Sequence, residues 1–473
     1  MLVQDNQRVQ YMYFLLSGIV ASSLLILAYV ALSTRANENL QNDIKSMQLS
    51  LDLIKPTSLV WSYNNTWRNL GHGWMRHKIY SAYFDRRVEI LDYPIDATLG
   101  IAIGSVRIFA ILPLYFRDEI ACIFRGEDFS LTKSMAQTTK PLQDHNDSTF
   151  AAYAIVCPLY RQMNESLVIR LPHAVAIKYK SNSLNKDSPT FVPISYPRDM
   201  NQLFAKSKPI LSICVAPLQA NTTTALGLVE FIEMYRLLGA GHFYFYAATY
   251  TKEVTDILSY YRKLGFVDTL HWNLGDHQLD LYMGGSVAQI NDCIYRAMSV
   301  DNFRYTAIVG LDEYLMPLKH NSLLRFMLQC DEGLTASYVF RNVFFYKKDR
   351  SDSFSIPERA TNRLLITQTK VKRSLEIMPA FTNSRFIVNT HASVEMGTKR
   401  LWRAAPGYTD HVLSPTVGLL FHYRNHCINC RSVMLIDYTA RRFGSLLWDR
   451  VDNACLQLFL KDKGVCPTKP TPS

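Results

Sequence analysis

The fold is decided by residues 210–247, which read ILSICVAPLQANTTTALGLVEFIEMYRLLGAGHFYFYA. Residues 210–216 are apolar and predict a short strand, 225–238 repeat apolar residues with a helical period, and 242–247 are aromatic enough to favour a second strand. Gly239 stands where a helix end needs a residue that tolerates a left-handed backbone. This order predicts a βαβ unit, and therefore an α/β fold with a parallel sheet and helices packed on its faces.

The same alternation continues along the chain. The further predicted elements are a helix at 254–264 ended by Gly265, a strand at 266–272, a helix at 286–300 with Ser286 as its N-cap, and a strand at 304–311. Ligands of parallel sheets bind at the carboxyl ends of the strands, so the residues after position 311 are expected to form a site.

An acidic pair, Asp312 and Glu313, follows that strand directly. Carboxylates at the end of an apolar strand are costly unless they are solvated, paired or bound to a metal. Mn²⁺ or Mg²⁺ prefers oxygen ligands and would neutralise the diphosphate of a nucleotide sugar. The alternative is that the pair simply begins a polar loop. Further on, residues 417–421 lead to His422 and Arg424, a metal-ligand type and a phosphate partner, provided that the fold brings them near Asp312.

The N-terminal region predicts one membrane span. Residues 11–32 contain no charge and are long enough for a bilayer core of roughly 30 Å. They indicate a signal-anchor behind a cytoplasmic tail of 1–10 and before a stem of 33–75. A cleaved signal peptide, as in a secreted structural glycoprotein, is the alternative. Apolar residues spaced four and three apart between 40 and 54 predict either an amphipathic helix or a dimerising stem, and the latter would make a homodimer.

Four sequons after this span favour a lumenal location for the main mass: Asn64, Asn146, Asn164 and Asn221. Nine cysteines agree with an oxidising compartment, and their odd number leaves at least one outside any intramolecular disulfide. For the Cys427 and Cys430 pair, a disulfide role or a buried thiol fits better than zinc. The net charge of +11 is scattered without basic runs, so no nucleic-acid partner is predicted.

The length of 473 residues predicts about two to three domains. Residues 76–205 indicate a β-rich N-terminal subdomain without a chemical motif. Its clearest strands are predicted at 98–114, 149–159 and 174–179. The α/β domain would then occupy 206–455, and 456–473 would form a C-terminal tail.

Over about 206–430 the sequence resembles glycosyltransferase family 92, a group of lumenal type II enzymes that includes β-galactosyltransferases. The matching stretches are 214–218 (CVAPL), 230–240 (EFIEMYRLLGA) leading into 242–246, 260–262 (YYR) with Gly265 and Trp272, 291–293 (NDC), 312–317 (DEYLMP) and 421–424 (FHYR), with 80–85 (YSAYFD) upstream. The resemblance implies a Rossmann-like GT-A fold and residence in the Golgi membrane. It also implies transfer of a hexose, galactose from UDP-galactose, to a glycan or glycoprotein acceptor with inversion.

Such folds commonly hold a metal through a D-x-D motif and a later histidine. The resemblance therefore assigns these roles to Asp312 and His422. The first acid of the motif is missing, because position 310 is Gly310, and Ser286 stands where the family has Gln. Besides a metal-assisted enzyme, two hypotheses follow: a metal-independent transferase, or a relative that binds glycans without turnover.

The expected mechanism is a single displacement in which a carboxylate base deprotonates the acceptor hydroxyl. Asp331 and Glu332, shortly after the acidic pair, are the candidates for this base. Arg236 and Asp292 lie on predicted helices and are candidate substrate contacts. For both of these, helix packing or an ion pair is the alternative.

Overall fold

The computed structural model describes residues 66–70, 77–91, 101–137, 140–161, 171–180, 189–197, 208–218, 223–275, 280–330, 333–352, 356–425 and 433–469. Several predictions lie outside these ranges: the span at 11–32, most of the stem, Asn64, Asn164, Asn221, Asp331, Glu332, Cys427 and Cys430. Among the described residues, no helix is both long and apolar enough to span a bilayer.

The smaller of two large sheets has eight strands in the order β5-β4-β7-β8-β2-β3-β6, with β1 paired to β2. Their bounds are β1 Arg68–Leu70, β2 His77–Asp85, β3 Ile101–Pro113, β4 Ile120–Arg125, β5 Leu131–Met135, β6 Phe150–Arg161, β7 Ala174–Tyr179 and β8 Val192–Ser195. Among the described strands of this sheet, only β2 and β8 pair in parallel. The predicted strands at 98–114, 149–159 and 174–179 are present as β3, β6 and β7, and a disulfide joins Cys122 of β4 to Cys157 of β6.

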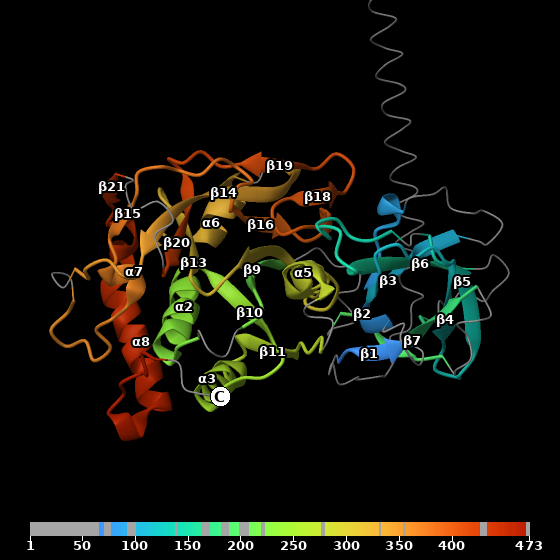
Figure 1. Cartoon of the computed structure of the whole chain (residues 1–473), viewed down its shortest axis with the longest axis horizontal. Coiled ribbons are helices and arrows are strands. Elements are labelled where there is room, and N and C mark those ends of the chain that lie inside the picture. The colour runs from blue at the N-terminus through green and yellow to red at the C-terminus, as the bar shows by residue number, and fades with distance from the viewer. Residues whose placement is uncertain are drawn as a thin grey trace, which may run out of the picture. The chain divides into compact units, whose positions relative to one another are not determined.

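The larger sheet begins with the predicted βαβ units (Figure 1). In chain order these are β9 Lys208–Val215, α2 Ala225–Leu237, β10 Ala240–Ala247, α3 Lys252–Lys263, β11 Val267–His271, α5 Ser286–Ser299 and β12 Phe303–Val309. The four strands are parallel and lie in the order β11-β10-β9-β12. The α/β fold predicted from residues 210–247 is therefore confirmed.

Beyond β12 the larger sheet continues as β16-β14-β15-β21, and β16 runs antiparallel to β12. The remaining elements are η1 Val88–Ile90, η5 Tyr282–Gly285, β13 Glu313–Pro317, α6 Leu323–Cys330, β14 Thr335–Tyr346, α7 Ile366–Thr369, β15 Lys372–Ser374, β16 Arg385–Asn389, β17 Ser393–Met396, β18 Leu401–Ala404, β19 Thr409–Val412, β20 Gly418–Arg424, β21 Met434–Ile436, η6 Thr439–Phe443, α8 Gly444–Leu458 and η7 Leu460–Asp462. A disulfide between Cys455 and Cys466 ties the segment after α8 back to this helix.

The predicted helix ends agree with the structure at α2 and α3 but not at α5. Gly239 and Gly265 have φ values of 98° and 80° just after α2 and α3, as predicted. The prediction of Ser286 as an N-cap is wrong, because Gly285 takes that position at φ 80° and Ser286 is the first helical residue. The Ser286 hydroxyl donates to the Met283 carbonyl oxygen at 2.6 Å, so it is not used to accept a helix N–H.

Each face of the larger sheet has its own core. One core includes Phe231 of α2, Phe243 of β10 and Trp448 of α8. The other combines α5 and neighbouring strands with side chains of the smaller sheet, such as Tyr80 and Phe109. On this side a disulfide joins Cys214 of β9 to Cys293 of α5.

A buried carboxylate joins the two sheets through α5. Asp292 accepts hydrogen bonds from Ser81 Oγ at 2.5 Å, Tyr83 OH at 2.7 Å and Tyr246 OH at 2.6 Å. The fully buried Arg296 guanidinium lies 3.8 Å away, one turn along the helix. A charge without solvent needs such partners, so Asp292 holds β2, β10 and α5 together.

We expect Asp292→Asn to lower the free energy of unfolding by about 3 kcal/mol, because it leaves Arg296 buried without a counter-charge. Chemical denaturation at pH 7 measures this. The control is Asp449→Asn, which breaks an ion pair to Arg359 whose side chains are 68% and 47% exposed. It should change stability by no more than about 0.5 kcal/mol. Equal effects of the two substitutions would contradict the role given to Asp292.

A second buried carboxylate, Glu230 of α2, holds the start of α7. Its oxygens accept hydrogen bonds from the backbone N–H groups of Ile366 and Thr367 and from Thr367 Oγ1, at 2.7–2.8 Å. Burial raises the pKa of Glu230 to about 7, although these hydrogen bonds pull in the opposite direction. The folded chain therefore holds a proton here that the unfolded chain loses near its ordinary value of 4.5.

This raised pKa predicts that stability falls as the pH rises. Below the unfolded pKa of 4.5, Glu230 makes its full contribution to the free energy of unfolding. By pH 7 about 3 kcal/mol of this free energy is lost, since the unfolded state then binds fewer protons than the folded state. Glu230→Gln should be less stable at pH 5 but flatter between pH 5 and 7, measured by denaturation at each pH. The exposed Glu358→Gln should keep the wild-type slope. An unchanged slope in Glu230→Gln would show that Glu230 does not titrate there.

Candidate functional site

The site is built on the turn that ends β12. The strand runs buried to Val309, and the Glu313 N–H donates to the Gly310 carbonyl oxygen at 3.2 Å to close the turn. The side chain of Glu313 folds back over the same turn, where its Oε2 accepts the Gly310 N–H at 2.6 Å. Asp312, between them, keeps 41% of its side chain exposed, so it is the carboxylate of the pair that faces outward.

Strand β20 brings His422 to this turn. β13 and β20 pair antiparallel with Glu313 opposite His422, and the Tyr423 N–H donates to the Asp312 carbonyl oxygen at 2.8 Å. His422 Nε2 lies 3.6 Å from Asp312 Oδ2, and its Nδ1 lies 3.7 Å from Glu313 Oε1. The sequence made His422 a candidate metal ligand only if the fold brought it near Asp312. The pairing of β13 with β20 meets this condition.

Glu313 forms an ion pair with an arginine that the sequence analysis did not identify. Arg385, the first residue of β16, donates from Nε to Glu313 Oε2 at 2.6 Å, while the Glu313 side chain is only 3% exposed. Burial lowers the pKa of Arg385, but the neighbouring Glu313 carboxylate more than offsets this and the pKa is raised. Arg385 reaches Glu313 because β16 pairs with β12. No local sequence pattern predicts this pairing.

Two further cations approach from the ends of β14 and β20. The Arg424 guanidinium lies over the Phe344 ring, 5.0 Å from its centroid, and the His422 ring contacts the same phenyl group at 5.5 Å. Within the described part of the chain, Arg424 Nη1 is buried without a hydrogen-bond partner. Lys347 adjoins it, since its backbone N–H donates to the Arg424 carbonyl oxygen at 2.8 Å.

These groups hold Asp312 in its charged form. Burial alone would raise the pKa of Asp312, but the hydrogen bond and charge of His422 and the charge of Lys347 lower it. The exposed end of β12 therefore offers one carboxylate and one imidazole, bordered by Lys347, Arg385 and Arg424. A phosphate-bearing ligand fits this charge pattern, because guanidinium and ammonium groups bind phosphate oxygens.

The residues also fit a divalent cation, as two of its ligands. A separation of 3.6 Å between Asp312 Oδ2 and His422 Nε2 allows both atoms to reach one ion, with phosphate and water completing the shell. No group of three His, Cys, Asp or Glu side chains suited to a metal occurs among the described residues. Binding at Nε2 requires the proton on His422 Nδ1. Glu313 Oε1 lies 3.7 Å from Nδ1, while Asn342 Nδ2, itself a donor, stands 3.3 Å away and shares a hydrogen bond with Nδ1 only when that nitrogen is unprotonated.

The other predicted site residues lie elsewhere. Arg236 pairs with Glu233 at 2.7 Å and covers the Phe266 ring, so it belongs to the α2–α3 packing. Asp292 is fully buried in the network described above. Asn146, the one predicted sequon within the described ranges, is exposed at a turn with φ 46°.

The match to the family model of glycosyltransferase family 92 extends over residues 210–445, about half of the chain. This stretch contains the turn after β12 and the strand that carries His422, so the class of protein is a glycosyltransferase. The chain belongs to glycosyltransferase family 92. No curated protein matches the chain.

Similar solved structures include Staphylococcus aureus TarS 1–349 in complex with UDP-GlcNAc, at 12% identity and a TM-score of 0.27, covering 54% of this chain and 70% of that one. HddC from Yersinia pseudotuberculosis is 9% identical with a TM-score of 0.23, covering 51% and 98%. A UDP-glucose pyrophosphorylase complexed with UDP-glucose is 8% identical with a TM-score of 0.22, covering 50% and 98%. These scores are too low for a functional inference.

Gly310→Asp should strengthen Mn²⁺ binding about tenfold, because it adds a carboxylate ligand to the pair. A Cβ at position 310 would lie 3.3 Å from both Asp312 Oδ1 and Glu313 Oε2, so the new carboxylate adjoins the predicted ion. Calorimetric titration with Mn²⁺ alone measures the change. Gly310→Ala, which adds the Cβ without the charge, should leave the affinity unaltered. If the two variants bind Mn²⁺ equally, Asp312 is not part of a metal site.

Proposed function

We propose that this glycosyltransferase transfers a hexose, galactose from UDP-galactose, to a hydroxyl group of a glycan or glycoprotein acceptor with inversion. The observation that carries the proposal is the meeting of Asp312 and His422 at the carboxyl end of β12, with Lys347 and Arg424 beside them. That arrangement suits a nucleoside diphosphate. The choice of galactose, the inversion and the GT-A assignment come from the resemblance to the family.

In the proposed reaction the acceptor oxygen attacks the anomeric carbon, its proton passes to a carboxylate base, and the bond to the UDP oxygen breaks. Asp312 and His422 would hold Mn²⁺ or Mg²⁺, which when bound neutralises charge on the departing diphosphate. Lys347 and Arg424 are positioned to bind phosphate oxygens in both the donor and the departing UDP. Asp331 and Glu332 remain the proposed bases.

The structure argues against two other roles in this chemistry. Asp292 does not suit a substrate contact, because its oxygens already accept three hydroxyl hydrogen bonds away from solvent. Arg236 does not suit a phosphate contact while its guanidinium pairs with Glu233. The donor site is therefore proposed to be formed by β12, β13, β14 and β20, together with Arg385 of β16.

A second candidate is a family member that binds glycans without turnover. Gly310 favours it, since the first acid of the motif is absent and Glu313 cannot replace it. The Oε2 of Glu313 is already shared by the Gly310 N–H and by Arg385. Turnover of a UDP-sugar separates this candidate from the enzyme.

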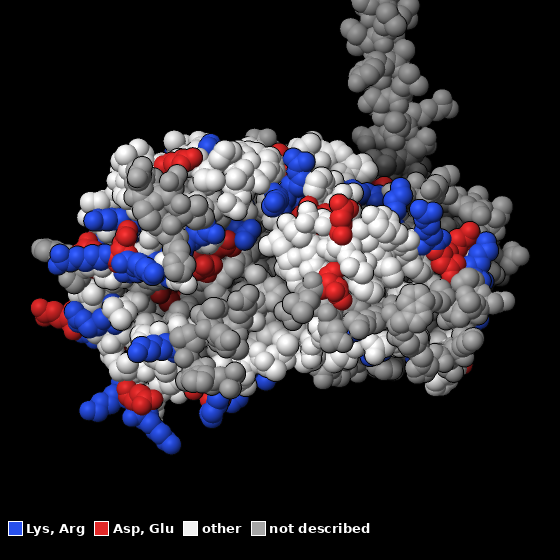
Figure 2. All heavy atoms as spheres, in the orientation of Figure 1, with Lys and Arg blue, Asp and Glu red and all other residues white. Residues whose placement is uncertain are grey.

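We propose that the chain is a single-pass type II protein of the Golgi membrane with its catalytic region in the lumen. Three disulfides among the described cysteines and the exposed sequon at Asn146 support an oxidising, glycosylating compartment. On the face shown in Figure 2, basic side chains are interspersed with acidic ones. The anchor at 11–32 and a homodimer through the stem remain predictions.

Calorimetric titration with UDP, with and without Mn²⁺, tests the proposed donor site. Asp312→Ala should abolish the metal-dependent part of binding, and Arg424→Gln should weaken UDP about tenfold under both conditions. Arg359→Gln removes the same charge from an exposed ion pair and should bind UDP like the wild type. Absence of UDP binding in the wild type would rule out the proposed donor site.

The donor sugar and turnover need a separate measurement. We expect UDP release from UDP-galactose in the presence of a glycan acceptor to exceed release from UDP-glucose and UDP-GlcNAc. A chelator should reduce the rate if the metal assists. Binding of UDP without turnover of any of the three donors would favour the glycan-binding candidate.

A further inference from the structure

The hairpin of β17 and β18 carries an exposed aromatic side chain with a cation beside it. The indole group of Trp402 in β18 is 40% exposed, and its Nε1 donates to Asp144 Oδ1 at 3.1 Å. The Arg400 guanidinium group lies 5.1 Å from the centroid of this indole ring and 5.3 Å from that of the Phe381 ring. Phe381, Arg400 and Trp402 thus form one continuous series of contacts, here called the Arg400 platform.

The Arg400 platform adjoins the proposed donor site through the loop before β16. The Asn383 carbonyl oxygen in this loop accepts a hydrogen bond from Asn342 Nδ2 at 3.0 Å, and the same amide nitrogen stands 3.3 Å from His422 Nδ1. The loop begins with Phe381 of the platform and leads into Arg385 of the donor site. A ligand that lies on the platform is therefore at the border of the place where the donor is proposed to bind.

Two residues of this loop have a strained backbone. Phe381 has a φ of 65° and Asn383 a φ of 53°. A bulky residue such as phenylalanine rarely adopts this left-handed region, and strain of this kind concentrates at sites that bind ligands. The strained turn holds the Phe381 ring against Arg400, where it completes the platform.

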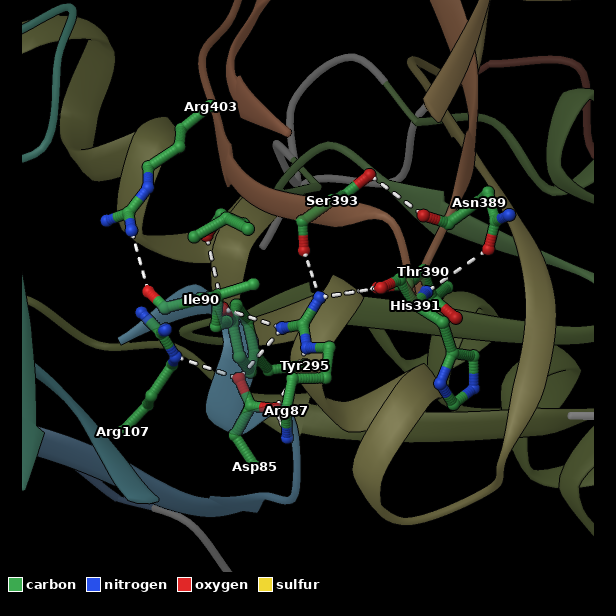
Figure 3. A network of polar contacts seen from close by, with 11 residues as sticks. Asp85, Arg87, Ile90, Arg107, Tyr295, Asn389, Thr390, His391, Ser393 and Arg403 are labelled. Atoms are coloured by element: carbon green, nitrogen blue, oxygen red, sulfur yellow. Dashed lines mark hydrogen bonds and ion pairs between the residues drawn. The ribbon is translucent and has the colours of Figure 1, made fainter. Parts of the chain in front are cut away.

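The hairpin that carries Trp402 is fixed against the segment after β2. Arg87 Nη1 donates to the Ser393 carbonyl oxygen of β17 at 2.8 Å, and Arg403 Nη2 of β18 donates to the Ile90 carbonyl oxygen at 2.7 Å (Figure 3). Each strand of the hairpin is thus held by an arginine. A surface that is already fixed loses little conformational entropy when it binds a ligand.

Arg400 offers hydrogen-bond donors beside the two rings. In the described part of the chain its guanidinium group forms no hydrogen bond, and its contacts are with these rings. Its charge also reaches Asp410: burial raises the pKa of this carboxyl group, while the Ser337 hydroxyl group and Arg400 pull the pKa down. A sugar ring has an apolar face of C–H groups and a rim of hydroxyl groups, so aromatic rings beside charged groups can bind both.

We propose that the Arg400 platform binds a sugar ring of the acceptor glycan, packed against Trp402 and hydrogen-bonded through its hydroxyl groups to Arg400. The inference rests on the proposed function, because the platform would present the acceptor to the donor site at Asp312 and His422. A protein partner needs a wider surface than these three side chains provide, whereas a single sugar ring matches their size.

The test is binding of the full-length chain in detergent to an array of oligosaccharides that end in galactose, N-acetylglucosamine, mannose or fucose. Arg400→Gln should weaken the glycan binding of the wild type about tenfold because it removes the guanidinium donors, and Trp402→Leu should do the same because it removes the ring. Lys399→Gln, which removes an exposed charge from the same turn, should bind glycans like the wild type. Calorimetric titration with UDP should give the wild-type affinity in all three variants.

If Trp402→Leu misfolds, Phe381→Gly replaces it, because glycine adopts the same positive φ without strain. This variant should also weaken glycan binding. Unaltered glycan binding in Arg400→Gln, or a wild type that binds UDP but no oligosaccharide of the array, would overturn the inference. A wild type that binds glycans through Arg400 but does not bind UDP would instead overturn the proposed donor site and leave the platform in place.

Discussion

The buried carboxylate of Asp292 in α5 ties together three elements of the structure, β2, β10 and α5 itself. It accepts hydroxyl hydrogen bonds from β2 of the smaller sheet and from β10 of the larger sheet, and it balances Arg296 on its own helix. A buried charge is destabilised when it loses a hydrogen-bond donor or its counter-ion. Because Ser81 and Tyr83 of β2 are two of these donors, β2 is held in one position against α5. The disulfide from Cys214 to Cys293 fixes the same helix to β9. The smaller sheet is therefore bonded into the α/β fold through polar groups as well as apolar packing.

The proposed site depends on a second buried carboxylate. One oxygen of Glu313, Oε2, accepts hydrogen bonds from both the Gly310 N–H and Arg385. The side chain therefore stabilises the turn rather than facing the ligand. Asp312 is left as the exposed acid beside His422. Gly310 stands where the D-x-D motif has its first acid, and the side chain of Glu313 folds over this glycine. Lys347, Arg385 and Arg424 around it give the site a positive balance, which suits a diphosphate with or without a metal.

Much of the fold follows from local rules. The apolar periods of 210–311 predict each strand and helix of the parallel region to within a few residues, and Gly239 and Gly265 mark the helix ends because only their backbones adopt a positive φ without strain. The rule failed at Ser286, where Gly285 capped the helix and the serine hydroxyl found a nearer carbonyl group. It failed there because the chain enters the helix through Gly284 and Gly285, both in the left-handed region at φ 60° and 80°, and this path is set by the preceding turn.

The α/β class, the acidic strand end and the family can be read from the sequence, since these depend on periodicity and on short ordered motifs. Which side chains meet depends instead on how distant strands and helices pack. The pairing of β13 with β20 places His422 beside Asp312. Glu313 forms an ion pair with Arg385, and Asp292 is fully buried. The physical reason is that a carboxylate's role is set by what surrounds it. Burial and several of the partners, such as Arg385 for Glu313 and Ser81 and Tyr83 for Asp292, come from segments far away in the chain that only the folded structure brings together.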